Sequence, residues 1–268
     1  IGYDLYVHSH PSNDRGETVL DQKQVFDTLS AHGVTYFTGV PDSYLNGFCH
    51  YALDHCGNRH VMTANEGNAV ALAAGHYFAS QEIPLVYMQN SGMGNTINPL
   101  ASLVDQDVYA VPMLLLIGWR GQVRDGVSTE PKHPQHKLQG EITPGLLDVM
   151  HIPYTVLEDD DAQFARTIAK AVAFCGKNRR PYALIAPKGV MADPDKPNHV
   201  DAVYPMSREE AIEIILDHMP EDTIYCATTG RATRELFWLR ERRTESESLH
   251  GKEDSMACHR FDFLNVGS

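Results

Sequence analysis

The stretch of sequence that decides the fold is residues 63–75, which read TANEGNAVALAAG. An apolar, β-type run ends at Thr63, and a helix of very small residues follows it. Glu66 is the one carboxylate at this junction, where solvation is poor, so it is a candidate for proton chemistry. The alternative is a helix N-terminal acid that the helix dipole stabilises. The small side chains favour the first interpretation, because Ala and Gly let a ligand or a partner subunit approach the backbone closely.

Outward from this stretch, short apolar runs alternate with helical patterns. The patterns predict strands at 35–38, 60–63, 84–88, 111–117, 154–157 and 181–186. They predict helices at 66–80, 95–104 and 161–175, a long loop at 118–140 and a short helix closing at 146–150. An earlier helix is expected to be capped by Asp21 and to end at Gly33. Because the strands are apolar on both faces, the sequence predicts an α/β fold with a doubly wound parallel sheet.

The alternation of strands and helices stops at residues 188–205, and this interruption predicts a second domain. Residues 191–197 read MADPDKP, a linker-like composition, and Ser207 with Glu210 forms a capping box for a helix that runs to His218. The pattern that follows predicts a strand at 223–227, a helix at 230–240, a polar and mobile segment at 244–257 and a strand near 263. One helix–strand–helix unit does not bury its own core. We therefore expect a first domain at 1–190, a linker at 191–205 and the beginning of a truncated α/β domain at 206–268.

Composition excludes several classes of protein. The net charge of −13 and the pI near 5.4 argue against a nucleic-acid-binding surface. No apolar run reaches the roughly 18 residues of a membrane span, and no signal peptide is visible. Five scattered cysteines without a CxxC pair favour a reducing cytoplasm. The chain begins at Ile1 and not at methionine, so we expect its natural start to be missing.

A glycine-rich turn follows the predicted strand at 84–88. Residues 89–95 read QNSGMGN and open a helix, so their backbone N–H groups are suited to cradle a phosphate. The segment lacks the dinucleotide GxGxxG pattern and the lysine of a P-loop. A tight strand-to-helix turn without a ligand is an equal alternative.

The predicted loop at 118–140 is cationic in an acidic chain. Arg120, Arg124, Lys132 and Lys137 stand against Asp125 and Glu130, a surplus of two positive charges before His133 and His136 are counted. Cationic groups at the carboxyl end of a parallel strand favour a small anionic ligand. The alternative is a solvated surface loop. The two histidines lack the neighbouring ligands that a metal site needs.

A third strand-to-helix junction lies in the second predicted domain. Residues 228–230 read TTG and end the strand predicted at 223–227. Their hydroxyl and N–H groups suit phosphate oxygens, or Thr228 or Thr229 is an ordinary helix cap.

Together these segments resemble a known family. Residues 39–43 (GVPDS), 65–69 (NEGNA) and 89–95 (QNSGMGN) resemble the pyrimidine-binding domain of thiamine-diphosphate-dependent decarboxylases. The segments GWRG at 118–121, PQH at 134–136, QGEIT at 139–143, TTG at 228–230 and REL at 234–236 are similar to the phosphonopyruvate and sulfopyruvate branch of that family. The resemblance runs from about residue 21 to the end of the chain.

The resemblance implies a thiamine-diphosphate-binding fold and a set of site residues. It implies that Glu66 is catalytic, hydrogen-bonding the aminopyrimidine ring of thiamine diphosphate so that the cofactor forms its ylid. The cofactor-binding residues that it implies are Pro41, Asp42, Asn90, Gly92, Met93, Asn95, Thr229 and Gly230. Arg120, His133 and His136 are the implied ligands of the substrate's anionic group.

The implied reaction is the decarboxylation of 3-phosphonopyruvate to phosphonoacetaldehyde and CO2 in phosphonate biosynthesis, by a cytoplasmic lyase. The implied partners are a small anionic 2-oxo acid and another subunit that completes the site, as in a homo-oligomer, without nucleic acid or membrane. The family's Gly-Asp-Gly motif, which holds Mg²⁺ and the diphosphate, is absent here, so we expect the metal ligands beyond Ser268. Arg231 stands where lysine is expected, and residues 122–133 are longer than the family's usual loop.

Three functions remain open from the sequence. The first is the phosphonopyruvate decarboxylase, with sulfopyruvate as the alternative substrate, because both substrates carry a tetrahedral anion. The second is a non-catalytic pyrimidine-domain partner of another chain. The third is a doubly wound protein that binds a different phosphorylated ligand.

Overall fold

The structure is a computed structural model that describes residues 19–124, 127–128, 134–193, 205–220, 222–227, 231–248 and 262–264. The chain divides into two compact units, residues 1–129 with 136–195 and residues 130–135 with 196–268. We call them the first and the second unit and describe each by itself. The domain limits expected from the sequence stay predictions.

The first unit is built on one parallel sheet of six strands. Their order across the sheet is β2 (His60–Met62), β1 (Phe37–Gly39), β3 (Leu85–Gln89), β4 (Leu114–Gly118), β8 (Tyr182–Ala186) and β7 (Tyr154–Val156). From β1 the chain winds to β2 on one side and then returns to β3 on the other side. The sheet is therefore doubly wound, and its switch point, where such folds bind ligands, lies between β1 and β3.

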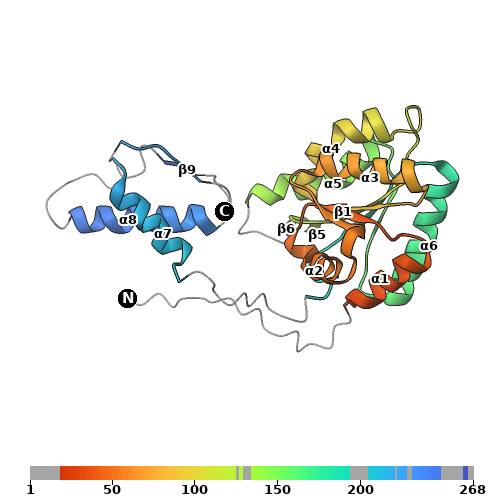
Figure 1. Cartoon of the computed structure of the whole chain (residues 1–268), viewed down its shortest axis with the longest axis horizontal. Helices are drawn as coiled ribbons and strands as arrows, with labels where there is room; N and C mark the ends of the chain where they lie inside the picture. Colours follow the sequence, from red (N-terminus) through yellow and green to blue (C-terminus); the bar gives the residue numbers. More distant parts are fainter. Residues whose placement is uncertain are drawn as a thin grey trace. The chain divides into compact units, whose positions relative to one another are not determined.

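Helices cover both faces of this sheet (Figure 1). One face carries α1 (Gln22–Ala31), α2 (Asn46–His55) and α6 (Asp161–Asn178), and the other carries α3 (Glu66–Ser80), α4 (Met93–Pro99) and α5 (Pro134–Val149). Side chains of β3 alternate between the two cores: Leu85 and Tyr87 lie in the first, Val86 and Met88 in the second. The predicted sheet with two apolar faces is confirmed for the central strands, whereas the edge strands β2 and β7 are half-buried or exposed.

Local capping fixes where the helices begin. The side chains of Asp21, Asn65 and Asp160 accept hydrogen bonds from backbone N–H groups in the first turns of α1, α3 and α6. The predicted bounds of the helix after Asn65 are confirmed at both ends. Gly33, two residues after the end of α1, has a φ of +79°, which glycine adopts without strain.

The helix predicted at 95–104 is divided in two. A short 3₁₀ turn, η3 (Asn90–Gly92), leads into α4, and a π-helical turn, η4 (Leu100–Val104), follows it. Pro99 ends α4 and has no N–H to donate, which accounts for a change of helix type at this point. Two further 3₁₀ turns, η1 (Ser43–Leu45) and η2 (Gly57–Arg59), flank α2.

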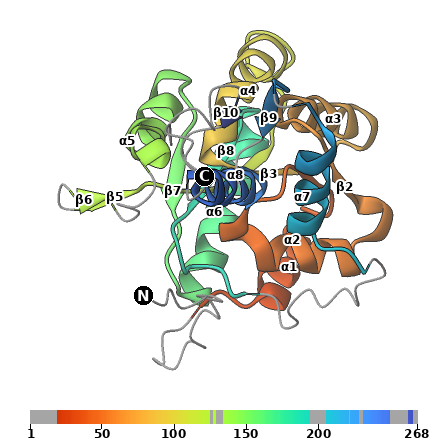
Figure 2. The ribbon, with the colours of Figure 1, turned by 90° about the vertical axis from the view of Figure 1, so that its left-hand side faces the viewer.

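The prediction of a continuous loop at 118–140 is wrong, because the segment contains two short strands and its last seven residues, 134–140, begin a helix. The described part begins with a small hairpin, β5 (Val123–Arg124) and β6 (Val127–Ser128), and α5 already starts at Pro134 (Figure 2). Proline suits the first position of a helix, because the N–H that it lacks has no partner inside the helix there. The helix expected at 146–150 is the last turn of this 16-residue helix.

The second unit contains α7 (Arg208–His218), β9 (Tyr225–Ala227), α8 (Arg231–Ser248) and β10 (Asp262–Leu264). The predicted capping box is confirmed, because Ser207 and Glu210 exchange hydrogen bonds between side chain and backbone. β10 pairs in parallel with β9, and Leu216, Leu236 and Leu239 form a small core. The expectation of a mobile segment at 244–257 is wrong for residues 244–248, which continue α8. No helix in the described part of the chain has the length and hydropathy to cross a membrane.

Candidate active site

Four loops that carry the predicted site residues meet at one edge of the sheet. The segments that follow β1, β2, β3 and β4, up to the first turn of the next helix, contain Asp42, Glu66, Asn90 and Arg120. These four strands are neighbours and all run parallel, so their carboxyl ends share an edge. Three hydrogen bonds connect these segments, from Asn95 to Glu66, from Asn90 to Arg120 and from Arg120 to Asp42, and they join residues that are 29 to 78 positions apart in the sequence. The sheet therefore assembles the predicted motifs into one region.

Glu66 is the first residue of α3, and its side chain lies against two residues that follow β3, Gly92 of η3 and Asn95 of α4. The Nδ2 of Asn95 donates to Oε2 of Glu66 at 2.7 Å. On the other side, a Cβ placed on Gly92 would overlap the Glu66 carboxylate, so only glycine leaves room for it. The helix N-terminus favours the negative charge. The expected poor solvation is not found in this chain, because Glu66 is half-buried and its bond to Asn95 is exposed.

Asp42 and Arg120 form a mostly buried ion pair. The Nε of Arg120 lies 3.4 Å from Oδ1 of Asp42, whose side chain is 0% exposed against 18% for the arginine. The second carboxylate oxygen of Asp42 accepts the N–H of Tyr44 at 3.0 Å. The guanidinium also donates to the Ser43 hydroxyl and lies over the Tyr44 ring, 4.6 Å from its centroid. Burial raises the pKa of Asp42, and the charge of Arg120 offsets part of that rise.

Asn90 holds the backbone of Arg120 from both sides. Its Oδ1 accepts the Arg120 N–H at 3.2 Å, and its Nδ2 donates to the Arg120 carbonyl at 2.9 Å. The same Nδ2 donates to the Thr143 hydroxyl at 3.0 Å, which connects the pair to α5. Asn90 is buried, and these contacts occupy both ends of its amide. The structure thus gives Asn90 a protein partner where the sequence predicts a cofactor contact.

The residues after Arg120 pack directly against α5. Gly121 has a φ of +68°, and a Cβ there would overlap the carbonyl of His136. A Cβ on Gly140 would overlap the carbonyl of Gly121, and the indole N–H of Trp119 donates to the Gly140 carbonyl at 2.9 Å. These close approaches place His136, in the first turn of α5, beside the loop that carries Arg120.

The other predicted residues differ in their setting. Pro41 is exposed at the edge. Met93 is 3% exposed and packs in the core beneath α3 and α4, so its side chain is not presented to a ligand. His133, Thr229 and Gly230 lie outside the described residues.

Sequence reasoning missed three residues that the site uses. Gly118 is one, because a Cβ there would overlap the Asp42 carboxylate. Tyr44 lies beneath the guanidinium, and Thr143 anchors Asn90. Gly118 and Thr143 lie within the GWRG and QGEIT segments that carry the family resemblance, so the sequence did point to their surroundings. Tyr44 lies outside every such segment.

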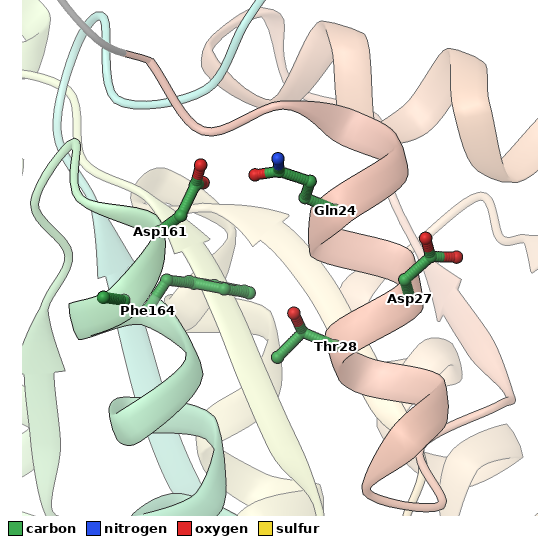
Figure 3. Close-up of a pocket in the computed structure, with 6 residues that line it drawn as sticks. Gln24, Asp27, Thr28, Asp161 and Phe164 are labelled. Atoms are coloured by element: carbon green, nitrogen blue, oxygen red, sulfur yellow. The ribbon is translucent and has the colours of Figure 1, made fainter.

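A hollow of about 370 Å³ lies elsewhere, between α1 and α6. Figure 3 shows Gln24 and Thr28 of α1 facing Asp161 and Phe164 of α6. None of the predicted site residues lines this hollow. Among the residues that the structure describes, no group of three or more His, Cys, Asp or Glu side chains is arranged to hold a metal.

Comparison with known proteins identifies the family to which this chain belongs. The profile described as "Thiamine pyrophosphate enzyme, N-terminal TPP binding domain" matches residues 22–151. The sulfopyruvate decarboxylase subunit alpha of Methanococcus maripaludis is 32% identical over 130 residues, which are 48% of this chain and 72% of that protein. The chain belongs to the thiamine pyrophosphate enzyme family. Thiamine pyrophosphate is another name for thiamine diphosphate, so the resemblance seen in the sequence is confirmed.

Two longer relatives of this chain are phosphonopyruvate decarboxylases. The protein of Streptomyces viridochromogenes is 32% identical over 231 residues, covering 80% of this chain and 56% of its own length. The protein of Streptomyces hygroscopicus is 29% identical over 233 residues, covering 80% and 55%. The chain thus spans about half the length of these two relatives.

Proposed function

We propose that this chain provides the pyrimidine-binding part of a thiamine-diphosphate-dependent decarboxylase that converts 3-phosphonopyruvate to phosphonoacetaldehyde and CO2. The observation that carries the proposal is the carboxylate of Glu66, which Asn95 binds and Gly92 leaves space for, at the sheet edge that also carries Arg120. The names of the two streptomycete relatives support the substrate.

The residues at the sheet edge fit the cofactor. A partly exposed carboxylate with a fixed orientation is the group needed to hold a proton at a ring nitrogen, and Glu66 has both properties. When bound, thiamine diphosphate supplies the electron sink for loss of CO2 from a 2-oxo acid. The chain's own contribution is to hold Glu66 in place through Asn95, and to leave space for its carboxylate at Gly92.

We propose that the substrate's phosphonate binds near Arg120 and His136, with His133 as a further candidate. Guanidinium and imidazolium groups bind tetrahedral anions through charge-assisted hydrogen bonds. Arg120 is mostly buried, so its charge acts in a medium of lower dielectric than water. Asp42 offsets part of this charge, and water and salt screen the acidic balance of the rest of the chain over longer distances.

We propose that another subunit completes the site in a homo-oligomer, and that Mg²⁺ is held by residues outside those described. Exposed apolar side chains on the two helices that carry Glu66 and Asn95 support a subunit contact: Leu72 and Phe78 on α3 are 38% and 46% exposed, and Ile97 on α4 is 43% exposed. Apolar groups on neighbouring helices favour burial against a partner.

We also propose a cytoplasmic location. The described cysteines Cys49, Cys56, Cys175 and Cys226 are free thiols. Burial raises the pKa of Cys49 and of Cys175 to about 12, so both stay protonated and unreactive near neutral pH.

Sulfopyruvate is the second candidate substrate, because the chain covers 72% of the methanococcal sulfopyruvate subunit. Phosphonopyruvate ranks first, because its two decarboxylases each match 80% of this chain and the methanococcal subunit matches 48%.

Product analysis tests the proposed function. The enzyme that contains this chain, supplied with thiamine diphosphate and Mg²⁺, is incubated with phosphonopyruvate or sulfopyruvate, and the aldehyde product is identified by NMR. We expect phosphonoacetaldehyde to form faster than its sulfonate counterpart at equal substrate concentration. Preferential turnover of sulfopyruvate would assign the second candidate, and no turnover of either would contradict both.

A further inference from the structure

The carboxylate of Asp42 is buried and already bound by protein groups, which is not the setting expected of a residue that binds a cofactor. Its side chain is fully buried, and both of its carboxylate oxygens face protein donors, the Arg120 Nε and the Tyr44 N–H. The space that the carboxylate occupies exists only because residue 118 is glycine. A carboxylate removed from water in this way is stable only beside a compensating charge, and Arg120 supplies that charge.

Arg120 is held along its whole length. Asn90 fixes its backbone N–H and carbonyl, Tyr44 lies beneath the guanidinium, and Asp42 and Ser43 receive its side-chain N–H groups. A long, flexible side chain loses much rotamer entropy on binding an anion, and a side chain that is already fixed does not lose it again. The contacts of Arg120 therefore lower the entropic cost of binding an anion at its guanidinium.

We propose that Asp42 is a positioning residue that holds the Arg120 guanidinium at the sheet edge, and that it does not bind the cofactor. The inference rests on the proposed function, in which Arg120 receives the anionic group of the substrate. It replaces the sequence-based prediction of Asp42 as a cofactor ligand. Gly118 contributes to the same positioning, because any larger residue at 118 would displace the Asp42 carboxylate.

The decisive variant is Asp42→Asn in the enzyme that contains this chain. Asparagine caps a helical turn about as well as aspartate, so the bond to the Tyr44 N–H is retained while the charge beside Arg120 is lost. The matched control is Asp21→Asn, which also alters a capping aspartate, because Asp21 accepts the Gln24 N–H at 3.0 Å away from the site.

We expect Asp42→Asn to raise the KM for phosphonopyruvate about tenfold or more, because loss of the Arg120 guanidinium's fixed position outweighs the gain from removing a negative charge beside the anion, with kcat and thiamine diphosphate affinity changed less than about threefold. Gly118→Ala should raise KM in the same way while leaving every charge in place. Asp21→Asn should leave KM unchanged. Thermal unfolding of each variant verifies that the protein is folded, and Gly118→Ala provides the test if Asp42→Asn is not.

A double-mutant cycle separates positioning from a merely structural role. If Asp42 acts through Arg120, Asp42→Asn adds little further increase in KM to an Arg120→Ala enzyme. Independent, multiplying effects on KM would overturn the inference. Weaker thiamine diphosphate binding by Asp42→Asn with an unchanged KM for phosphonopyruvate would also overturn the inference, because it would show that Asp42 binds the cofactor. Absence of turnover by the unsubstituted enzyme would instead contradict the proposed function, and the inference with it.

Discussion

Gly92 and Gly94 lie two positions apart, yet only one of them is next to the catalytic candidate. A Cβ on Gly92 would overlap the Glu66 carboxylate, whereas a Cβ on Gly94 would meet no atom within 4 Å. At the scale of single residues, the site is therefore shaped as much by absent side chains as by present ones. Gly118 has the same role beside Asp42.

This pair of glycines gives a matched prediction. Gly92→Ala displaces the Glu66 carboxylate, and misplacement of a catalytic group by about 1 Å lowers turnover about 100-fold. Gly94→Ala meets open space and should change turnover less than about threefold. Steady-state kinetics of both variants, with thermal unfolding as a control, measures the difference. Equal turnover by the two variants would show that Gly92 does not orient Glu66.

Glu66 and Arg120 could be singled out from the sequence as candidates, because carboxylate and guanidinium groups suit proton transfer and anion binding, and the structure brings both to one edge of the sheet. The sequence was not sufficient for Asn90. The sequence placed Asn90 in a glycine turn, where a cofactor contact was the natural prediction. Its actual partner, the backbone of Arg120, lies 30 positions away and comes within reach only because β3 and β4 are neighbours in the sheet.

At the scale of elements, most helices and strands could be predicted, and α5 could not. Its first residues are polar and Pro144 lies inside it, so no clear apolar period marks this helix. Pro134 suits the first position of a helix, but proline alone is equally common in a loop. Tertiary contacts supply what the local sequence lacks. Gly140 of α5 packs on the backbone of Gly121, and Trp119 hydrogen-bonds the carbonyl of Gly140.

This packing predicts a difference between two glycines of α5. Gly140→Ala would overlap the Gly121 carbonyl and should lower the free energy of unfolding by about 1–3 kcal/mol, as overpacking does. Gly145→Ala meets no atom within 4 Å and should be neutral, or stabilising by up to about 1 kcal/mol. Denaturant unfolding followed by Trp119 fluorescence in a Trp238→Phe background reports on this contact. A Gly140→Ala protein as stable as the Gly145→Ala protein would contradict the close approach.

At the scale of the whole molecule, the site depends on two orders, that of the motifs along the chain and that of the strands across the sheet. The motifs follow β1, β2, β3 and β4 in sequence, and the doubly wound topology brings the four strands side by side. The sequence predicted this architecture from strands that are apolar on both faces. It could not predict which apolar side chains on the helices stay exposed, because that depends on how the helices pack.

Those exposed side chains lead to a prediction about assembly. Leu72→Lys or Ile97→Lys would place a charge in the proposed subunit contact and should shift the enzyme to smaller species, because an unpaired buried charge is costly. Leu53 on α2, 55% exposed on the opposite face of the sheet, provides the control variant Leu53→Lys. Sedimentation velocity measures the masses. Unchanged masses in the Leu72 and Ile97 variants would place the subunit contact elsewhere.

The most direct test of Glu66 is the Glu66→Gln variant of the enzyme that contains this chain, with turnover of phosphonopyruvate measured at saturating thiamine diphosphate and Mg²⁺. The amide keeps the shape of the side chain but does not take up a proton as a carboxylate does. We expect turnover to fall by about 100-fold or more, in the range typical of a lost proton-transfer group, while the unfolding temperature stays unchanged. A folded Glu66→Gln enzyme with the turnover of the unsubstituted enzyme would contradict the role of Glu66.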